Sequence, residues 1–85
     1  MAHFVYILRC KDNSLYTGYT TDVNRRLKVH NQGKGAKYTR GRLPVSLVYY
    51  EEVSSRSEGL KLENAIKKLS KKEKEDLVSN FDLEK

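Results

Sequence analysis

The segment of residues 3–10 constrains the fold most, because it is apolar on both of its alternating sides. One side carries Phe4, Tyr6, Leu8 and Cys10, and the other carries Val5 and Ile7. A strand with apolar side chains toward both faces of a sheet is covered on both faces and does not lie at the edge. We therefore predict a buried strand here, with other elements packed against both of its faces.

Residues 15–20, Leu-Tyr-Thr-Gly-Tyr-Thr, are predicted to form a second strand. Gly18 weakens this strand and indicates that another group approaches the backbone closely. If Asp12-Asn13 formed a two-residue hairpin loop, Tyr6 and Tyr16 would point to opposite faces of the sheet. A loop of odd length, or a bulge, would bring both to one face. We predict the second arrangement, because a site shared by the two phenols requires it.

A helix is predicted over about residues 22–32, with Thr21 as its N-cap and Gly33 as its C′ stop. Its buried stripe is formed by Val23, Leu27 and His30. Arg26 and His30 are four residues apart, so they lie one turn from each other at the edge of that stripe.

Residues 33–44 are predicted to form a loop by composition. The candidate nucleic-acid contacts in it are Lys34, Lys37, Tyr38, Arg40 and Arg42. Phosphate-contacting loops combine cations, an aromatic ring and flexible glycines, whereas ordinary solvated loops seldom combine all three. We therefore favour contact with nucleic acid over a merely solvated loop.

A third strand is predicted over residues 45–51. The pattern Ser55-x-x-Glu58 is a capping box that opens a second long helix, and Ser70-x-x-Glu73 is another that opens a last helix. The side chains expected to face the core are Leu62, Ile66 and Leu69 in the first of these helices, and Leu77, Val78 and Phe81 in and after the second.

The whole chain has a formal net charge of +6, and its excess of basic residues is concentrated in the first part of the sequence. Residues 1–50 hold nine Lys and Arg against two Asp and Glu, whereas residues 51–85 hold eight against nine. The excess belongs to the part that carries the tyrosines, which favours a polyanionic partner, nucleic acid first. A soluble basic surface is the simpler alternative, and the asymmetry counts against it.

The length of 85 residues fits one domain over residues 1–85, with a core over about 3–81. Cys10 is the only cysteine, which excludes an internal disulfide, and a small core residue is favoured over a reactive thiol. No apolar stretch is long enough for a signal peptide or a membrane span. We expect a cytoplasmic monomer without a membrane partner.

Tyr6 and Tyr16, taken singly, are explained as strand aromatics. A phenol has a pKa of about 10 and is a base at neutral pH only where positive charge or a metal lowers it. Arg26 offers such a charge and could hold two phosphate oxygens, with an exposed solvated arginine as the alternative. Glu63 precedes Lys67 by one turn, which on pattern alone favours an exposed ion pair. A single carboxylate can nonetheless hold Mg²⁺ when waters and a phosphate complete the coordination.

The order of these residues resembles the GIY-YIG nuclease superfamily. The matching positions are Phe4-Val5-Tyr6, Tyr16-Thr17-Gly18, Arg26, His30 and Glu63. Residues 35–42 resemble a stretch of small stand-alone, single-domain bacterial members. Phe4 stands where the first motif has Gly, and Thr17 where the second has Ile; both are backbone and packing positions. For the family asparagine after the glutamate, the candidate is Asn80.

The resemblance implies an α/β (α+β) fold with a three-stranded antiparallel sheet flanked by three helices. It also implies phosphodiester hydrolysis with one Mg²⁺ or Mn²⁺ ion. In that family scheme Tyr6 would help to activate the attacking water, and Tyr16 would assist or orient it. Arg26 would bind the scissile phosphate, and His30 would transfer a proton or hold a phenol in place. Glu63 would anchor the metal ion.

Three functions remain open. The first is a metal-dependent endonuclease acting on DNA in preference to RNA, structure-selectively or in repair or recombination. The second is a non-catalytic nucleic-acid-binding module with the same fold, which would bind in a salt-sensitive way without cutting. The third is an interaction protein working through the last helix, which would need Leu77 or Phe81 to be exposed.

Overall fold

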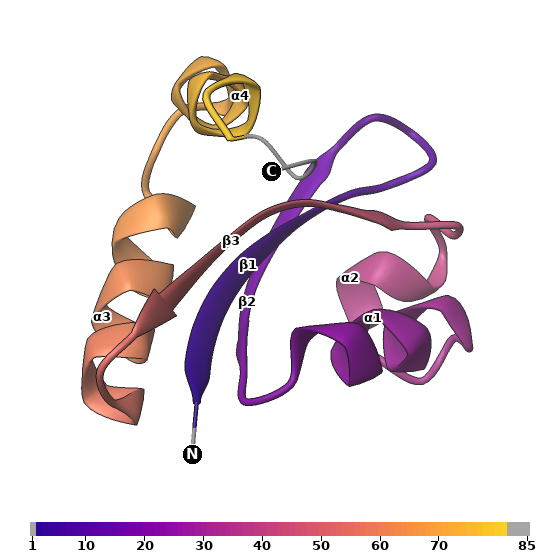
Figure 1. The fold of residues 1–85 in the computed structure, drawn as a ribbon. Coiled ribbons are helices and arrows are strands. Elements are labelled where there is room, and N and C mark those ends of the chain that lie inside the picture. Colours follow the sequence, from indigo (N-terminus) through magenta and orange to yellow (C-terminus); the bar gives the residue numbers. More distant parts are fainter. Residues whose placement is uncertain (1, 82–85) are drawn as a thin grey trace.

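The computed structural model describes residues 2–81, which form a three-stranded antiparallel sheet with helices on both faces (Figure 1). The elements in chain order are β1 (His3–Arg9), β2 (Leu15–Thr20), α1 (Val23–Asn31), α2 (Lys37–Arg40), β3 (Ser46–Val53), α3 (Arg56–Lys67) and α4 (Lys71–Ser79). The predicted α+β class and sheet are confirmed. The described part of the chain holds four helices rather than three, because α2 forms inside the segment predicted as a loop.

β1 lies in the middle of the sheet, whose strand order is β2-β1-β3. Val5 and Ile7 point to the face covered by α3 and α4, where they pack with Ile66. Tyr6 and Leu8 point to the opposite face, which α1 and α2 cover (Figure 1). The prediction of a strand covered on both faces is therefore confirmed, and each face of β1 contributes to a separate apolar cluster.

The hairpin between β1 and β2 has a three-residue loop, residues 11–13. The Cys10 N–H donates to the Ser14 carbonyl at 2.9 Å, and the Asn13 N–H donates to the Cys10 carbonyl at 2.9 Å. Asn13 has φ of +69°, a left-handed conformation that Asn tolerates better than most residues. A turn closed by one left-handed residue is a usual three-residue hairpin connection.

This odd-length loop sets the register of the two strands. Leu8 pairs with Tyr16, and Tyr6 pairs with Gly18. Because residues directly opposite each other share a face, Tyr6 and Tyr16 point to the same side of the sheet. The sequence prediction of a shared face for the two phenols is confirmed.

α1 begins one residue later than predicted, because Asp22 and not Thr21 is its N-cap. The Asp22 carboxylate accepts a hydrogen bond from the Arg25 N–H at 3.1 Å, and the Asp22 N–H donates to the Thr20 hydroxyl at 3.2 Å. Asp is at least as good an N-cap as Thr, and its carboxylate also favours the positive end of the helix dipole. Gly33 follows the helix with φ of +78°, as expected of a C′ glycine.

β3 also differs from its predicted bounds, since it runs Ser46–Val53 rather than over 45–51. The Asn31 side chain holds the backbone of Val45: its amide donates to the Val45 carbonyl at 3.0 Å and its oxygen accepts from the Val45 N–H at 2.8 Å. Both backbone groups of Val45 are thus taken by a side chain of α1. The strand ladder therefore starts one residue later.

α3 and α4 begin at the predicted serines. Ser70 and Glu73 form the complete reciprocal capping box, whereas Ser55 accepts from the Glu58 N–H but the Glu58 carboxylate accepts from the Ser54 hydroxyl instead. The side chains that pack against the α3–α4 core cluster include Leu62, Leu77, Val78 and Phe81. Leu77 and Phe81 pack against the core, whereas an interaction role for the last helix would require one of them to be exposed. The structure therefore gives no support to that third function.

Candidate active site

The centre of the candidate site is a buried hydrogen bond between β1 and α1. The Tyr6 hydroxyl lies 2.9 Å from His30 Nε2. Tyr6 is 2 % exposed and His30 is fully buried, at the place where α1 packs on the sheet. A polar pair of this kind is stable in a protein interior only when both groups are hydrogen-bonded.

Thr39 of α2 decides which nitrogen of His30 carries the proton. The Thr39 hydroxyl donates to the Ala36 carbonyl at 2.9 Å, so its oxygen is left to accept from His30 Nδ1–H at 2.8 Å. In the neutral imidazole Nε2 is then the acceptor, and the Tyr6 hydroxyl donates to it. This assignment follows from the hydrogen-bond network. The network points the basic nitrogen of His30 at the phenol.

Two glycines leave room for these rings. A Cβ on Gly18 would lie 2.5 Å from the Tyr6 hydroxyl oxygen, and a Cβ on Gly35 would overlap His30 Nδ1. The group expected to approach the backbone at Gly18 is therefore the Tyr6 ring, lying across its strand partner. Any larger residue at either position would displace one member of the Tyr6–His30 pair.

Tyr16 connects this buried pair to the surface. Its ring centroid lies 5.4 Å from that of His30, in an edge-on arrangement, and 5.9 Å from that of Tyr38, in a stacked one. Tyr38 is 40 % exposed, and the Arg42 guanidinium lies over its ring at 4.0 Å. A row of rings thus runs from His30 to the surface of α2.

Electrostatics keep both central groups neutral. Burial raises the pKa of Tyr6 to about 12, although the neighbouring Arg26 guanidinium acts in the opposite direction, and the charges of Tyr16 and Glu63 raise it further. Burial, and then the charge of Arg26, lower the pKa of His30 below its ordinary value. At neutral pH the pair is a phenol beside an unprotonated imidazole. Such a pair can accept one proton at the phenol oxygen while passing another to His30.

Arg26 supplies a positive charge beside this pair. Together with Arg25 it lines a pocket of about 270 Å³ whose other walls are Thr20, Thr21, Asp22 and Val29. Within residues 2–81 the Arg26 guanidinium forms no ion pair with a carboxylate. The Asp22 carboxylate in the wall accepts from the Arg25 N–H as the N-cap of α1. A guanidinium that borders a pocket and has no ion-pair partner among the described residues is suited to bind a phosphate there.

Glu63 approaches from the other face of the sheet, on α3, which packs on β1 and β2 (Figure 1). Its side chain is 15 % exposed and forms the predicted ion pair with Lys67 at 3.0 Å. Its charge also raises the pKa of Tyr6, so the carboxylate lies within electrostatic range of the central phenol. Both sequence readings of Glu63, the ion pair and the site carboxylate, are compatible with this geometry.

The donor set near Tyr6 fits a hard divalent cation held by few protein ligands. Residues 2–81 contain no cluster of three or more His, Cys, Asp or Glu side chains that could enclose an ion. Mg²⁺ is commonly held by one or two carboxylates, with waters and substrate phosphate as the remaining ligands. A largely buried Glu63 carboxylate meets that requirement, whereas a site for Zn²⁺ would need more nitrogen or sulfur donors.

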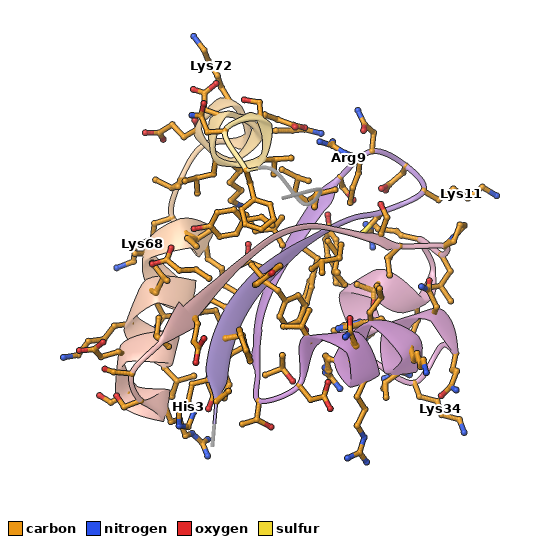
Figure 2. The ribbon with its side chains drawn as sticks, in the orientation of Figure 1. His3, Arg9, Lys11, Lys34, Lys68 and Lys72 are labelled. Carbon is orange, nitrogen blue, oxygen red and sulfur yellow. The ribbon has the colours of Figure 1, made fainter. Side chains whose placement is uncertain are left out.

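The predicted loop cations are not equivalent in the structure. Lys34, Lys37 and Arg40 are exposed, and Lys34 extends outward beyond α1 (Figure 2). Arg42 is engaged, because its Nε lies 3.0 Å from an Asp12 carboxylate oxygen and one of its NH groups donates to the Tyr38 carbonyl at 2.7 Å. The candidate nucleic-acid contacts therefore comprise three exposed cations, Lys34, Lys37 and Arg40, and Arg42, which is paired with Asp12.

Sequence reasoning assigned no role to two residues that contact the His30 ring or make room for it. Thr39 and Gly35 were read as loop residues, although one bonds His30 and the other accommodates its ring. The burial of Thr39 between exposed neighbours is visible only once α2 is formed. Asn80, the candidate family asparagine, is the exposed C-cap of α4. Asn64, next to Glu63 on α3, is also exposed.

The model of the GIY-YIG catalytic domain matches residues 2–76. The chain belongs to the GIY-YIG family. This confirms the resemblance drawn from Tyr6, Tyr16 and Gly18. A UPF0213 protein of Staphylococcus haemolyticus is 57 % identical over 76 residues, which cover 89 % of this chain and 93 % of the relative. A UPF0213 protein of Haloquadratum walsbyi is 56 % identical over 76 residues, which cover 89 % of this chain and 85 % of the relative.

Solved structures extend the likeness of this GIY-YIG chain to the fold. The NMR structure of a UPF0213 protein from Bacillus halodurans is 58 % identical, covers 93 % of this chain and 84 % of its own, and has a TM-score of 0.60. The NMR structure of a protein from E. faecalis is 47 % identical, covers 100 % and 91 %, and has a TM-score of 0.64. Among residues 2–81, no helix has the length and apolar character needed to cross a membrane.

Proposed function

We propose that this GIY-YIG chain is a divalent-metal-dependent endonuclease that hydrolyses phosphodiester bonds in DNA. The observation that carries the proposal is the Tyr6 hydroxyl donating to the unprotonated Nε2 of a buried His30, beside the Arg26 guanidinium. This arrangement supplies a proton acceptor and a phosphate-binding cation at one place. A purely structural core has no need of a guanidinium that lacks an ion-pair partner among residues 2–81.

The chain's own groups would act as follows. The Tyr6 oxygen takes a proton from the attacking water while its own proton passes to His30 Nε2, which leaves an imidazolium whose Nδ1–H still donates to Thr39. Arg26 holds the non-bridging oxygens and neutralises the charge that develops on them. Tyr16 orients the Tyr6 and His30 rings. A divalent ion bound at Glu63 would supply Lewis-acid stabilisation of the leaving oxygen.

The phenol does not have to ionise before the reaction in this scheme. With the pKa of Tyr6 raised to about 12, a free phenolate is scarce at neutral pH. A relay in which the Tyr6 oxygen gains one proton as it loses another avoids that state. His30 is therefore the final proton acceptor, and Tyr6 relays the proton from the water to it.

Cleavage of branched, nicked and single-stranded DNA with Mg²⁺ or Mn²⁺ tests the proposal. Arg26→Ala and Glu63→Gln should each lower the single-turnover rate by about 10²–10³, the usual effect of removing a group that stabilises transition-state charge. Lys28→Ala, the same kind of charge loss on an exposed position of α1, should keep the wild-type rate. Wild-type activity no higher than that of Arg26→Ala would reject the enzymatic function.

A second candidate, the non-catalytic nucleic-acid-binding module, is favoured by one observation. The Lys67 ammonium lies 3.0 Å from a Glu63 carboxylate oxygen and would compete with a metal ion for it. In that case Glu63→Gln leaves DNA affinity unchanged, and no metal produces cutting. Lys67→Ala separates the two functions, because in an enzyme it should lower the metal concentration needed for half-maximal cleavage.

A further inference from the structure

A small basic pocket lies at the hairpin end of β2, outside the pocket of Arg26. Its volume is about 200 Å³, and its walls are Ser14, Leu15, Tyr38, Lys71 and Lys74. These residues come from the hairpin, from α2 and from α4, so tertiary folding alone brings them together.

The charges around this pocket do not cancel. Glu75 is held by Arg9 in a two-point ion pair, with distances of 2.7 and 2.9 Å, and Lys71 lies only at 4.0 Å from the same carboxylate. Asp12 is likewise paired with Arg42 at 3.0 Å. Glu75 and Asp12 are thus each held by an arginine, and the described lining of the pocket itself contains two lysines and no carboxylate, which gives it a net positive charge.

The orientation of Lys71 is fixed by the hairpin, whereas Lys74 remains available. The Lys71 ammonium donates to the Asn13 carbonyl at 2.7 Å, which uses one of its three N–H groups. Lys74 is half-buried and forms no ion pair within residues 2–81. An anion in the pocket would meet one preorganised ammonium and one free ammonium.

Contacting aromatic rings connect this pocket with the candidate active site. Tyr38 in its wall stacks on Tyr16, whose ring adjoins that of His30. Leu15 in its wall and Thr20 in the wall of the Arg26 pocket belong to the same strand, five residues apart, which corresponds to about 17 Å along a strand. That separation matches about five nucleotides of B-form rise, at about 3.4 Å each.

We propose that Tyr38, Lys71 and Lys74 form a second phosphate-binding subsite, which holds the backbone of the nucleic acid about five nucleotides from the phosphate at Arg26. The proposal rests on nucleic-acid binding by this face, as in the proposed function. Ammonium groups bind phosphate as point charges without base preference, so the subsite positions the strand and does not read its sequence. An exposed tyrosine adds contact with the sugar or base.

The test is the salt dependence of affinity for a DNA duplex and for a single strand of the same sequence. Loss of one phosphate contact should reduce the slope of log K against log salt by about 0.7–0.9. Lys74→Gln should lower the slope by that amount and weaken binding several-fold, and Lys74→Arg should restore both. Lys72→Gln is the matched control, because Lys72 is on the same helix and points away from the body of the molecule (Figure 2).

The outcomes separate this subsite from the catalytic proposal, because affinity reports the first and cleavage reports the second. If wild type binds with a slope that Lys74→Gln reduces but never cuts, the subsite stands and the nuclease function fails. If wild type cuts and Lys74→Gln has the same slope as Lys72→Gln, the subsite fails. If Lys74→Gln binds inorganic phosphate more weakly than wild type but keeps the wild-type salt slope on DNA, a free anion is the occupant and the backbone assignment is overturned.

Discussion

The two faces of the sheet are packed in different ways. Against α3 and α4 the buried side chains are Val5, Ile7, Tyr49 and Ile66, and contact between them is mostly apolar. Against α1 and α2 the sheet buries Tyr6 and Leu8, but there it also encloses the polar side chains of His30 and Thr39. One face is held together by apolar contacts, and the other encloses the hydrogen-bonded side chains of Tyr6, His30 and Thr39.

This difference separates stability from chemistry. Apolar burial contributes about 25 cal/mol for each Å² without requiring a particular direction, so the α3–α4 face should tolerate substitutions that keep volume. The Tyr6–His30–Thr39 chain depends on donors and acceptors that each have one partner, so a single missing atom leaves a buried polar group unsatisfied. We expect the first face to respond to volume and the second to hydrogen-bonding capacity.

The largest expected effect is on the apolar face. Ile66 is 3 % exposed and packs with Val5, Ile7 and Tyr49. Ile66→Ala should lower the free energy of unfolding by about 2–5 kcal/mol, and Ile66→Val by about 0.5–1.5 kcal/mol, because the loss follows the volume removed. Urea denaturation at low temperature measures both. A loss below about 1 kcal/mol for the alanine variant would contradict the role given to this face.

On the polar face, the corresponding change is Thr39→Val, which keeps the volume and removes the hydroxyl. His30 Nδ1–H then has no acceptor, at a cost of about 1–3 kcal/mol in the free energy of unfolding. Without that acceptor, His30 can carry its proton on Nε2 instead of Nδ1, and Nε2 then cannot accept from the Tyr6 hydroxyl. The single-turnover rate should therefore fall as well. Thr39→Ser keeps the hydroxyl and should keep the rate. Equal rates for Thr39→Val and wild type would argue against the relay.

The pH dependence of stability should also belong to the polar face. Burial and Arg26 lower the pKa of His30 below the value of about 6.5 expected for the unfolded chain. Below a pH of about 6.5 the unfolded chain binds more protons than the folded chain, so the free energy of unfolding falls as the pH decreases. Above that pH the contribution of the neutral His30 to stability is fully present. Urea denaturation between pH 5 and 7, at about half-unit steps, should show this slope for wild type and a flatter one for His30→Gln. The same slope in both would show that His30 is not its source.

The smallest expected effect is a gain on the apolar face. Thr17 is 3 % exposed, and its hydroxyl has no hydrogen-bond partner among the described residues. Thr17 pairs with Ile7 across β1 and β2, so it points toward α3. Thr17→Val should raise the free energy of unfolding by up to about 1 kcal/mol, since it replaces an unpaired hydroxyl by a methyl group. Thermal unfolding measures the change, and a lower melting temperature would reveal an acceptor for that hydroxyl.

Much of the framework could be predicted from short stretches of sequence. The double-sided apolar pattern of residues 3–10 predicted the central strand, and the need for a shared phenol face predicted the odd-length hairpin. Ser55 and Ser70 marked helix starts correctly because capping is local. Asp22 and Thr21 were both acceptable N-caps by residue type, and only the bond from the Arg25 N–H decided between them.

The candidate site was predictable in its residues but not in its connections. A four-residue helix such as α2 has too few positions to show an apolar period, so Thr39 could not be distinguished from its exposed neighbours. The bond of Thr39 to His30 spans nine residues, and the contact of Lys71 with Asn13 spans 58. No periodicity of a single element encodes a partner at those separations.

By itself, then, the amino-acid order determined the strands, the longer helices, the register of the hairpin and the family, because periodicity, capping and motif spacing act over a few residues. Tertiary structure alone decided the protonated nitrogen of His30, the approach of Glu63 from the opposite face, and the meeting of α4 with Tyr38. Those features depend on how layers pack against one another, and packing joins atoms that are close in space but far apart along the chain.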